Sequence, residues 1–335
     1  MKIVICDYKA DLGRGISYEI DRLKRELPDP EIVVFEYLDN KQELIQTLRD
    51  ADAVINTYVN LDREILSQCE QLKCIALNAV GYDMVDVQAA TDYRILVCPA
   101  AEYCTVEVAE HTFALIFALC RGLRKHINEI ENHVWDYMRA GTVERISGKT
   151  MTIFGFGKIG KAVATRGRAL GLKIQVVSQS LTADEARKLE VSLVDWEQAM
   201  DTSDILSNHM ALRPDTTGFF NLEKFKRCKK QPLFINTGRG KTVVEDDLVL
   251  ALDSGYLSGA GLDVLADENG DISGLALLGR DNVIVTPHAG FFSVESARDL
   301  QDISCDSVVA ALTGRYEDIS KIINREQIKD KPMGE

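Results

Sequence analysis

Three loop residues carry side chains capable of chemistry, and each lies beyond a short apolar run. Arg239 stands between two glycines, Glu268 lies in a later loop, and His288 follows a proline. A guanidinium can hold a carboxylate through two hydrogen bonds. An imidazole titrates near neutral pH and can pass a proton in either direction. Taken singly, each is more often a surface or structural residue, but together they favour acid–base chemistry on a small carboxylate.

A glycine-rich turn precedes these loops at residues 152–160, which read TIFGFGKIG. It follows an apolar run and opens a helix, which makes the Gly-x-Gly-x-x-Gly spacing specific. Gly155 allows the tight turn, Gly157 lets the backbone approach a diphosphate, and Gly160 lets the helix pack on the strand. Backbone N–H groups at the start of such a helix bind phosphate oxygens. The segment therefore predicts a dinucleotide site.

The next strand should end beside the ribose of that dinucleotide, where NAD sites usually have an acid. This chain has Ser178 there, followed by Gln179 and Ser180. The absent carboxylate would not repel a 2′-phosphate, yet no arginine or lysine follows at once to bind one. NAD and NADP both remain open, and the sequence favours NAD slightly.

Short apolar runs must supply the strands that position these loops. Runs that are apolar throughout, separated by polar helix-like stretches, are typical of parallel strands covered on both faces. A first series of runs covers residues 3–6, 32–35, 53–55, 74–77 and 95–97, and a second covers 151–154, 174–177, 205–206, 233–235, 259–262 and 283–285. The pattern predicts two parallel α/β units in tandem.

Two longer helices stand outside this alternation. One is expected from Thr105, its N-cap, to about Lys125, and the other from Ser293 to about Leu312. Neither is needed inside a strand–helix–strand repeat, so each could join the two units. No low-complexity linker separates them.

Composition excludes several classes of function. The chain has 335 residues and a formal net charge of -13, with no basic stretch of the kind that nucleic-acid binding requires. The acidic balance also argues against anionic membranes. The longest apolar run, residues 113–120, is too short to span a bilayer, and the N-terminus begins as a strand. We expect a cytoplasmic protein with no nucleic-acid or membrane partner.

Cysteines and the remaining histidines point to no metal. The eight cysteines show no Cys-x-x-Cys spacing, so buried free thiols are expected instead of disulfides or zinc. His111 is expected to make structural contacts, and His126 and His133 to be solvated.

Seven segments in order resemble the D-isomer-specific 2-hydroxyacid dehydrogenase family. They are the glycine turn, the three loops of Arg239, Glu268 and His288, and similar motifs over nearly the whole chain, namely VGYDMVD at 80–86, EYCTVEVAEH at 102–111 and NHMALRPDT at 208–216. The resemblance implies two parallel-sheet α/β domains, Rossmann-like and flavodoxin-like, with a cleft between them. Residues 1–103 plus 293–335 would form the substrate-binding domain, and residues 104–292 the dinucleotide-binding domain.

The resemblance also implies roles for the loop residues. Arg239 would hold the substrate carboxylate and polarise the keto oxygen, His288 would donate the proton as hydride arrives, and Glu268 would contact His288 and stabilise its charged form. Two further groups are implied. Cofactor contacts are expected from Thr105, Gly155, Gly157, Lys158, Ile159, Gly160, Ser178, His209, Thr237, Gly238, Asp263, Ala289 and Gly290, and substrate contacts from Tyr58, Val59, Val80, Gly81 and Arg239. A 2-oxoacid or 2-hydroxyacid substrate, a homodimer and no metal are expected.

Some features depart from the family, and alternatives remain. Ser178 replaces the usual acid, and Asn269 follows Glu268 where the family often has proline. A nucleotide-sensing corepressor scaffold, similar to the C-terminal binding proteins, could keep the same three residues. A relative acting on formate, phosphite or phosphoglycerate is another alternative, and the chain's end near residue 335 weakens the phosphoglycerate case.

Overall fold

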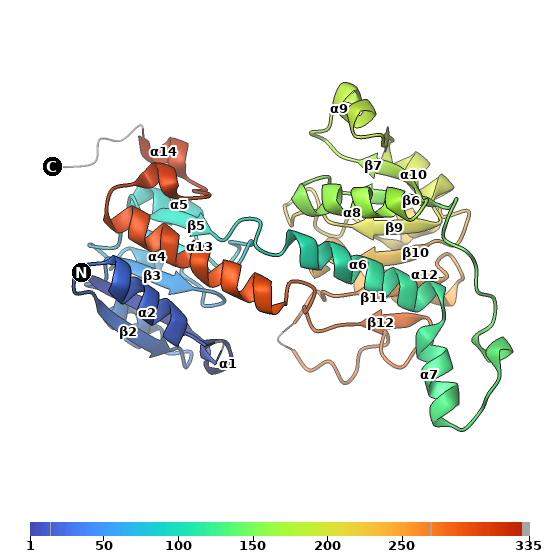
Figure 1. The fold of residues 1–335 in the computed structure, drawn as a ribbon, viewed down its shortest axis with the longest axis horizontal. Coiled ribbons are helices and arrows are strands. Elements are labelled where there is room, and N and C mark those ends of the chain that lie inside the picture. Colours follow the sequence, from blue (N-terminus) through green and yellow to red (C-terminus); the bar gives the residue numbers. More distant parts are fainter. Residues whose placement is uncertain (14, 269, 330–335) are drawn as a thin grey trace. The chain divides into compact units, whose positions relative to one another are not determined.

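Two compact units make up the chain in the computed structural model (Figure 1). The first comprises residues 1–103 and the chain from Ser293 onward, and the second comprises residues 104–292. The structure describes residues 1–13, 15–268 and 270–329. Residues 330–335 of the expected first domain lie outside the described residues, and so does Asn269, where the sequence departs from the family. No helix within the described ranges is long and apolar enough to cross a membrane.

A five-stranded parallel sheet forms the centre of the first unit. The strand order is β2-β1-β3-β4-β5, with bounds Lys2–Asp7 (β1), Glu31–Glu36 (β2), Ala53–Asn56 (β3), Cys74–Leu77 (β4) and Leu96–Pro99 (β5). Alternate residues of β1 face opposite sides, so that Val4 and Cys6 join one core, and Ile3 and Ile5 join the other. This two-sided burial is why the strands have no polar alternation.

Helices cover both faces of that sheet. The face that contains Val4 packs on α3 (Lys41–Leu48), α4 (Arg63–Leu66) and α5 (Val87–Asp92). The opposite face packs on α2 (Ser17–Glu26) and on α13 (Val294–Leu312), which lie side by side (Figure 1). The remaining elements are α1 (Lys9–Leu12), the short helix Tyr316–Asp318 and α14 (Arg325–Lys329).

The second unit is a doubly wound sheet of seven parallel strands. Their order is β12-β11-β10-β9-β6-β7-β8, with bounds Thr150–Phe154 (β6), Lys173–Val177 (β7), Ser192–Leu193 (β8), Ile205–Asn208 (β9), Leu233–Asn236 (β10), Gly259–Leu262 (β11) and Val283–Val285 (β12). The strand order reverses at β6, which pairs with β7 on one side and β9 on the other. Ligands of open α/β sheets bind beyond the carboxyl ends of the strands at such a point.

Helices enclose this sheet as well. One face packs on α6 (Thr105–Cys120), α8 (Lys158–Ala169) and α9 (Ala183–Lys188), and the other on α10 (Trp196–Thr202), α11 (Leu222–Phe225) and α12 (Glu245–Asp253). Short helices at Tyr137–Ala140 and Gly240–Thr242 complete the unit. The prediction of two parallel-sheet α/β domains is thus confirmed.

The prediction of one helix from Thr105 to about Lys125 is wrong in two respects. Gly122 adopts a left-handed conformation with φ 58°, which ends α6 and lets a separate helix, α7 (Leu123–Glu131), start in a new direction. The N-cap is Cys104, without a side-chain hydrogen bond, and Thr105 is already helical. By contrast, Ser293 caps α13 in a reciprocal capping box with Ser296, as its residue type favours.

Candidate active site

The candidate residues of the second unit gather beyond the carboxyl ends of its strands. Gly155 follows β6, Ser178 follows β7, and His209 follows β9. The loops after β10, β11 and β12 carry the segments 237–239, 263–268 and 286–290. Because parallel strands end at one edge of the sheet, residues far apart in sequence are brought to that edge.

The glycine turn has the backbone that its spacing predicts. Gly155 has φ 86°, and a Cβ at that position would lie 2.7 Å from the carbonyl oxygen of His209. A Cβ on Gly160 would overlap the carbonyl oxygen of Gly155. Gly157 is the N-cap of α8, and a Cβ there would meet no atom within 4 Å. The first and third glycines therefore allow close packing, while the second borders open space, which leaves the start of α8 accessible to a phosphate group.

The segment that follows β7, where the sequence predicts the ribose contact, is polar. The backbone N–H of Ser180 donates to Oγ of Ser178 at 3.3 Å. Gln179 donates to Asp215 at 3.4 Å, and Asp215 in turn pairs with Arg213 at 3.3 Å. The carboxylate of Asp215 is thus bonded to Gln179, next to Ser178, and the guanidinium of Arg213 is paired with that carboxylate.

His288 and Glu268, the predicted acid–base pair, are in direct contact. Nδ1 of His288 lies 2.8 Å from Oε2 of Glu268, with side-chain exposures of 37% and 39%. The second carboxylate oxygen of Glu268 accepts the backbone N–H of Leu265 at 3.3 Å, which fixes the acid within its own loop. Since Nδ1 faces the carboxylate, Nε2 is the nitrogen of His288 that can exchange a proton with a substrate.

Asp263 holds the loop that carries His288. Its Oδ1 accepts the Thr286 hydroxyl at 2.6 Å and the N–H of Ala289 at 2.9 Å, and its Oδ2 accepts the N–H of Gly290 at 2.9 Å. Its carbonyl oxygen accepts the N–H of His288 at 2.8 Å. These bonds stabilise the left-handed backbone of His288, with φ 51°. The Asp263 side chain is only 3% exposed, so it stabilises this loop through buried hydrogen bonds.

His111 completes the cluster around Asp263. Its Nε2 lies 2.9 Å from the Thr286 hydroxyl and 3.3 Å from Oδ1 of Asp263. Burial opposes ionisation of Asp263, but the hydrogen bonds from His111, Thr286 and Gly290 outweigh it and hold the pKa of that carboxyl below its usual value. Sequence reasoning gave His111 a structural role, and these contacts connect it to the His288 loop.

The turn of Arg239 abuts the loop of Glu268. A Cβ on Gly240 would overlap the carbonyl group of Leu265, so the two backbones are in direct contact there. Nη1 of Arg239 donates to the carbonyl oxygen of Gly238 at 2.9 Å, and the side chain is half-buried. The turn of Arg239 is therefore joined through Leu265 to the loop whose acid contacts His288.

His209 is half-buried and makes its hydrogen bonds within the protein. Its Nε2 lies 2.8 Å from the Ser207 hydroxyl and its Nδ1 lies 3.2 Å from the Thr237 hydroxyl, which in turn lies 3.0 Å from the hydroxyl of Thr112. Burial lowers the pKa of His209 to about 3, so the ring is neutral and links β9, β10 and α6.

The substrate candidates of the first unit follow β3 and β4. Tyr58 is 47% exposed, and its backbone N–H donates to Asp7 at 3.3 Å. Val59 is wholly buried in the core, where Asn56 bonds both its N–H and its carbonyl group. Val80 and Gly81 are half-buried beyond β4. Of these four residues, Val59 has no exposed surface for a ligand.

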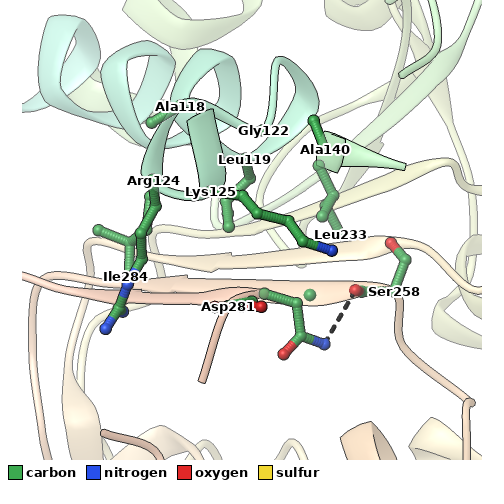
Figure 2. Close-up of a pocket in the computed structure, with 12 residues that line it drawn as sticks. Ala118, Leu119, Gly122, Arg124, Lys125, Ala140, Leu233, Ser258, Asp281 and Ile284 are labelled. Atoms are coloured by element: carbon green, nitrogen blue, oxygen red, sulfur yellow. Dashed lines mark hydrogen bonds between the residues drawn. The ribbon is translucent and has the colours of Figure 1, made fainter. Parts of the chain in front are cut away.

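A separate pocket of about 150 Å³ lies in the second unit, at the amino ends of strands β10, β11 and β12 (Figure 2). It is lined by Leu233 and Gly259, the first residues of β10 and β11, and by Asn282, which precedes β12. Arg124 closes one side and donates to the carbonyl oxygen of Val283 at 2.6 Å. The pocket faces away from the carboxyl ends of the strands and contains none of the candidate residues. No group of three or more potential metal ligands occurs among the residues that the structure describes.

The fold and this site define the class of two-unit α/β proteins with a dinucleotide-binding second unit. A sequence model described as "D-isomer specific 2-hydroxyacid dehydrogenase, NAD binding domain" matches residues 113–290. The chain belongs to the D-isomer specific 2-hydroxyacid dehydrogenase family, as the seven segments predicted. The match also supports a nicotinamide cofactor for the second unit.

Relatives of known sequence extend the similarity over most of the chain. It is 32% identical over 309 residues to a glycerate dehydrogenase of Methylorubrum extorquens, covering 90% of this chain and 95% of the relative. It is 31% identical to a hydroxypyruvate reductase of Blautia hydrogenotrophica, covering 83% and 87%. A D-3-phosphoglycerate dehydrogenase of Arabidopsis thaliana is 33% identical, covering 89% of this chain but only 51% of that longer protein.

Two solved structures share the whole fold. A D-lactate dehydrogenase of Aquifex aeolicus, complexed with NAD and lactic acid, superposes with a TM-score of 0.85 at 25% identity and covers 96% of this chain and 98% of its own. An acyclic imino acid reductase in complex with NADPH and D-Arg gives 0.84 at 26% identity, with coverages of 96% and 100%.

Proposed function

We propose that this protein reduces a 2-oxoacid to a D-2-hydroxyacid, and catalyses the reverse reaction, with a nicotinamide cofactor. The observation that carries the proposal is the 2.8 Å contact between Nδ1 of His288 and Oε2 of Glu268, at the sheet edge that also carries the glycine turn. The nicotinamide, when bound, supplies or accepts the hydride.

His288 is the proton donor in this proposal. Reduction of a keto group adds a hydride to carbon and a proton to oxygen, so the proton must come from a residue near that oxygen. Glu268 holds Nδ1 and stabilises the imidazolium, which leaves Nε2–H directed to the substrate. In the reverse direction Nε2 takes the hydroxyl proton.

Arg239 binds the substrate carboxylate. Its planar guanidinium suits two parallel hydrogen bonds to one carboxylate, which orients the adjacent keto carbon. A local cation is needed because the protein as a whole carries a formal net charge of -13, which repels a small anion.

The cofactor is held by two groups of residues. Gly155, Gly157, Lys158, Ile159 and Gly160 cradle the diphosphate, and Thr105, Ser178, Thr237, Gly238, Ala289 and Gly290 border the rest of the dinucleotide. Asp263 and His209 act through the loops that they hold, since both make their hydrogen bonds within the protein. NAD is favoured slightly over NADP, and the similarity to one structure with NAD and another with NADPH leaves both as candidates.

The substrate is selected by Tyr58, Val80 and Gly81 of the first unit, which we propose as its substrate-binding domain. Val59 contributes through the core that supports this loop, because its side chain is wholly buried. The relatives named above act, by their names, on glycerate, hydroxypyruvate, phosphoglycerate and lactate, which keeps a small 2-oxoacid as the substrate class. Their names give no support to a corepressor scaffold.

A homodimer is proposed from the arm between α6 and β6. In this arm α7 buries none of its residues, and Trp135, Tyr137 and Met138 are 93%, 82% and 67% exposed. Contiguous apolar side chains of this size usually mark a protein interface.

A substrate panel tests the proposed reaction. The purified protein is assayed for oxidation of NADH and of NADPH with glyoxylate, pyruvate, hydroxypyruvate, phosphohydroxypyruvate, and branched and aromatic 2-oxoacids, and the product is resolved by chiral chromatography. Turnover to the D-isomer is expected with at least one of them. No turnover with any 2-oxoacid, together with retained binding of the dinucleotide, would overturn the proposal and favour a nucleotide sensor.

A further inference from the structure

The turn that carries Arg239 is held by a buried polar network built from Asn208, Asn236 and Thr242. We propose that Asn208 and Thr242, to which the sequence analysis assigns no role, are positioning residues that fix the backbone of Arg239 and so the direction of its guanidinium. The inference rests on the proposed role of Arg239 in binding the substrate carboxylate.

The carbonyl oxygen of Arg239 is the point that the network holds. It accepts the Thr242 hydroxyl at 2.6 Å and Nδ2 of Asn236 at 3.2 Å. The backbone N–H of Thr242 also donates to it at 3.2 Å. Three donors on one carbonyl oxygen leave the peptide after Arg239 little freedom to rotate, and the Cα–Cβ direction of Arg239 depends on that peptide.

Asn208 joins this turn to the neighbouring strand. Its Nδ2 donates to Oδ1 of Asn236 at 2.9 Å and to Oγ1 of Thr242 at 2.8 Å. Its Oδ1 accepts the N–H of Met210 at 3.1 Å, in the loop that follows β9. The Arg239 turn is therefore tied through one side chain to the end of β9, beside the strand-order reversal.

Each hydrogen bond of this network has only one possible assignment of donor and acceptor. Asn208 has two amide hydrogens and uses both, which obliges Thr242 to accept from it and to donate its own hydrogen to Arg239. Oδ1 of Asn236 accepts from Asn208 and from the N–H of Gly238 at 3.1 Å. The three side chains are at most 1% exposed, so water cannot replace a lost partner.

Close backbone packing makes the turn sensitive to small displacements. A Cβ on Gly238 would lie 3.2 Å from the carbonyl oxygens of Asn208 and Met210, and one on Gly240 would overlap Leu265. The turn is thus enclosed on both sides of Arg239. Misplacement of a substrate-binding group by about 1 Å can cost on the order of a hundredfold in rate, which is the reason to hold it so firmly.

Thr242→Val is the decisive variant, because valine keeps the shape of threonine and removes the hydroxyl. We expect kcat/KM for the best 2-oxoacid to fall about tenfold, mainly through KM, as the loss of one buried hydrogen bond would produce. The dissociation constant of the dinucleotide should change less than about twofold. Thr242→Ser should restore most of the loss, since the hydroxyl returns.

Ser203→Ala is the matched control. Ser203 is also wholly buried in the second unit, and its hydroxyl contacts the carbonyl oxygen of Ala199 and the hydroxyl of Thr152, both at 2.6 Å, before the start of β9 and away from the Arg239 turn. It should lower the melting temperature to a similar degree and leave KM for the 2-oxoacid unchanged. Equal KM effects in the two variants would show that Thr242 acts through general stability, and would overturn the inference.

A second readout does not depend on turnover. Amide hydrogen exchange of residues 237–241 should quicken in Thr242→Val and in Asn208→Leu, and return towards the wild-type rate in Thr242→Ser. Unchanged exchange in both variants would overturn the positioning role even if the protein is an active dehydrogenase. Conversely, faster exchange with no wild-type turnover of any 2-oxoacid would support the network while contradicting the proposed reaction.

Discussion

Oε2 of Glu268 lies 2.8 Å from Nδ1 of His288, across the gap between the loops that follow β11 and β12. The contact is made between two half-exposed side chains, so neither is held by burial alone. Its geometry depends instead on Asp263, which accepts the Thr286 hydroxyl before Pro287 and the N–H of Ala289 after it, and on the bond from the N–H of Leu265 to Glu268. The acid–base pair is therefore a product of loop backbone positions.

Replacing His288 should remove the proton donor and leave the affinity for the cofactor nearly unchanged. His288→Ala is expected to lower kcat by about 10²–10⁴-fold, the range for loss of a general acid, and to change dinucleotide affinity less than about threefold. His288→Asn is the matched variant, since asparagine tolerates the left-handed φ of 51° at this position. Stopped-flow or steady-state kinetics and fluorescence titration of NADH measure both quantities. A parallel loss of affinity and turnover in both variants would contradict the role of His288 as proton donor.

Glu268→Gln should lower the rate of the reaction while the imidazole of His288 stays in place. An amide in place of the carboxylate no longer stabilises the imidazolium, so kcat for reduction at neutral pH should fall about tenfold or more. Asp267→Asn removes a neighbouring loop carboxylate and is expected to stay within about twofold of wild type. Steady-state kinetics measure kcat of both variants. If kcat of the Glu268→Gln variant matches that of the wild type, the contact is not used.

Much of this arrangement follows from sequence. The apolar runs located every strand of both sheets except β8, and the glycine spacing located the turn at the strand-order reversal. β8, Ser192–Leu193, has two exposed residues and gives no periodic signal. The helix from Thr105 was predicted too long because residues 123–125 are also helical but belong to α7, which the left-handed backbone of Gly122 separates from α6.

The buried polar residues of the site could not be predicted in the same way. Asn208, Asn236 and Thr242 resemble ordinary loop residues, because their burial arises only when β9 pairs with β10 in register, with Asn208 opposite Asn236. Asp263 was expected beside the nicotinamide, and its contacts lie within the protein because the loop after β12 folds back over it. Such networks are set by tertiary pairing, which a local pattern does not encode.

Asp263→Asn should destabilise the protein in a pH-dependent manner. The folded-state pKa of Asp263 is lowered, so its stabilising contribution is present above the unfolded value of about 4 and is lost as pH falls through the lower folded value. At pH 7 an amide would face donors from Thr286, Ala289 and Gly290, which should cost about 2 kcal/mol. Thermal unfolding from pH 3 to pH 7 measures the difference, which should shrink below about pH 4.

Asp253→Asn is the control for that experiment. Asp253 also has a lowered pKa, from its hydrogen bond with Arg280, but its side chain is 55% exposed and the pair is solvated. Its replacement should change the melting temperature little. If the two variants lose equal stability, or if the Asp263 deficit is the same at all pH values, the buried carboxylate does not stabilise the loop as argued.

Disrupting the arm should shift the oligomeric state. Trp135→Ser with Tyr137→Ser removes two of the most exposed aromatic side chains of the second unit, and we expect the proposed dimer to dissociate at micromolar concentration. Leu38→Ser removes a 70% exposed side chain of the first unit and should leave the mass unchanged. Analytical ultracentrifugation of the wild type and both variants measures the result. A monomeric wild type, or a dimer indifferent to the arm, would contradict the proposal.

Ser178→Asp should move cofactor preference towards NADH. A carboxylate after β7 would accept hydrogen bonds from the ribose hydroxyls and repel a 2′-phosphate, so the ratio of kcat/KM for NADH to that for NADPH should rise about tenfold or more. Ser192→Asp adds the same charge to the exposed strand β8 and controls for the general field. Arg213 and Asp215 lie close enough to Gln179 to influence the same phosphate, so Arg213→Ala should lower NADPH use selectively if the guanidinium contacts it. An unchanged ratio in Ser178→Asp would place the ribose contact elsewhere in the site.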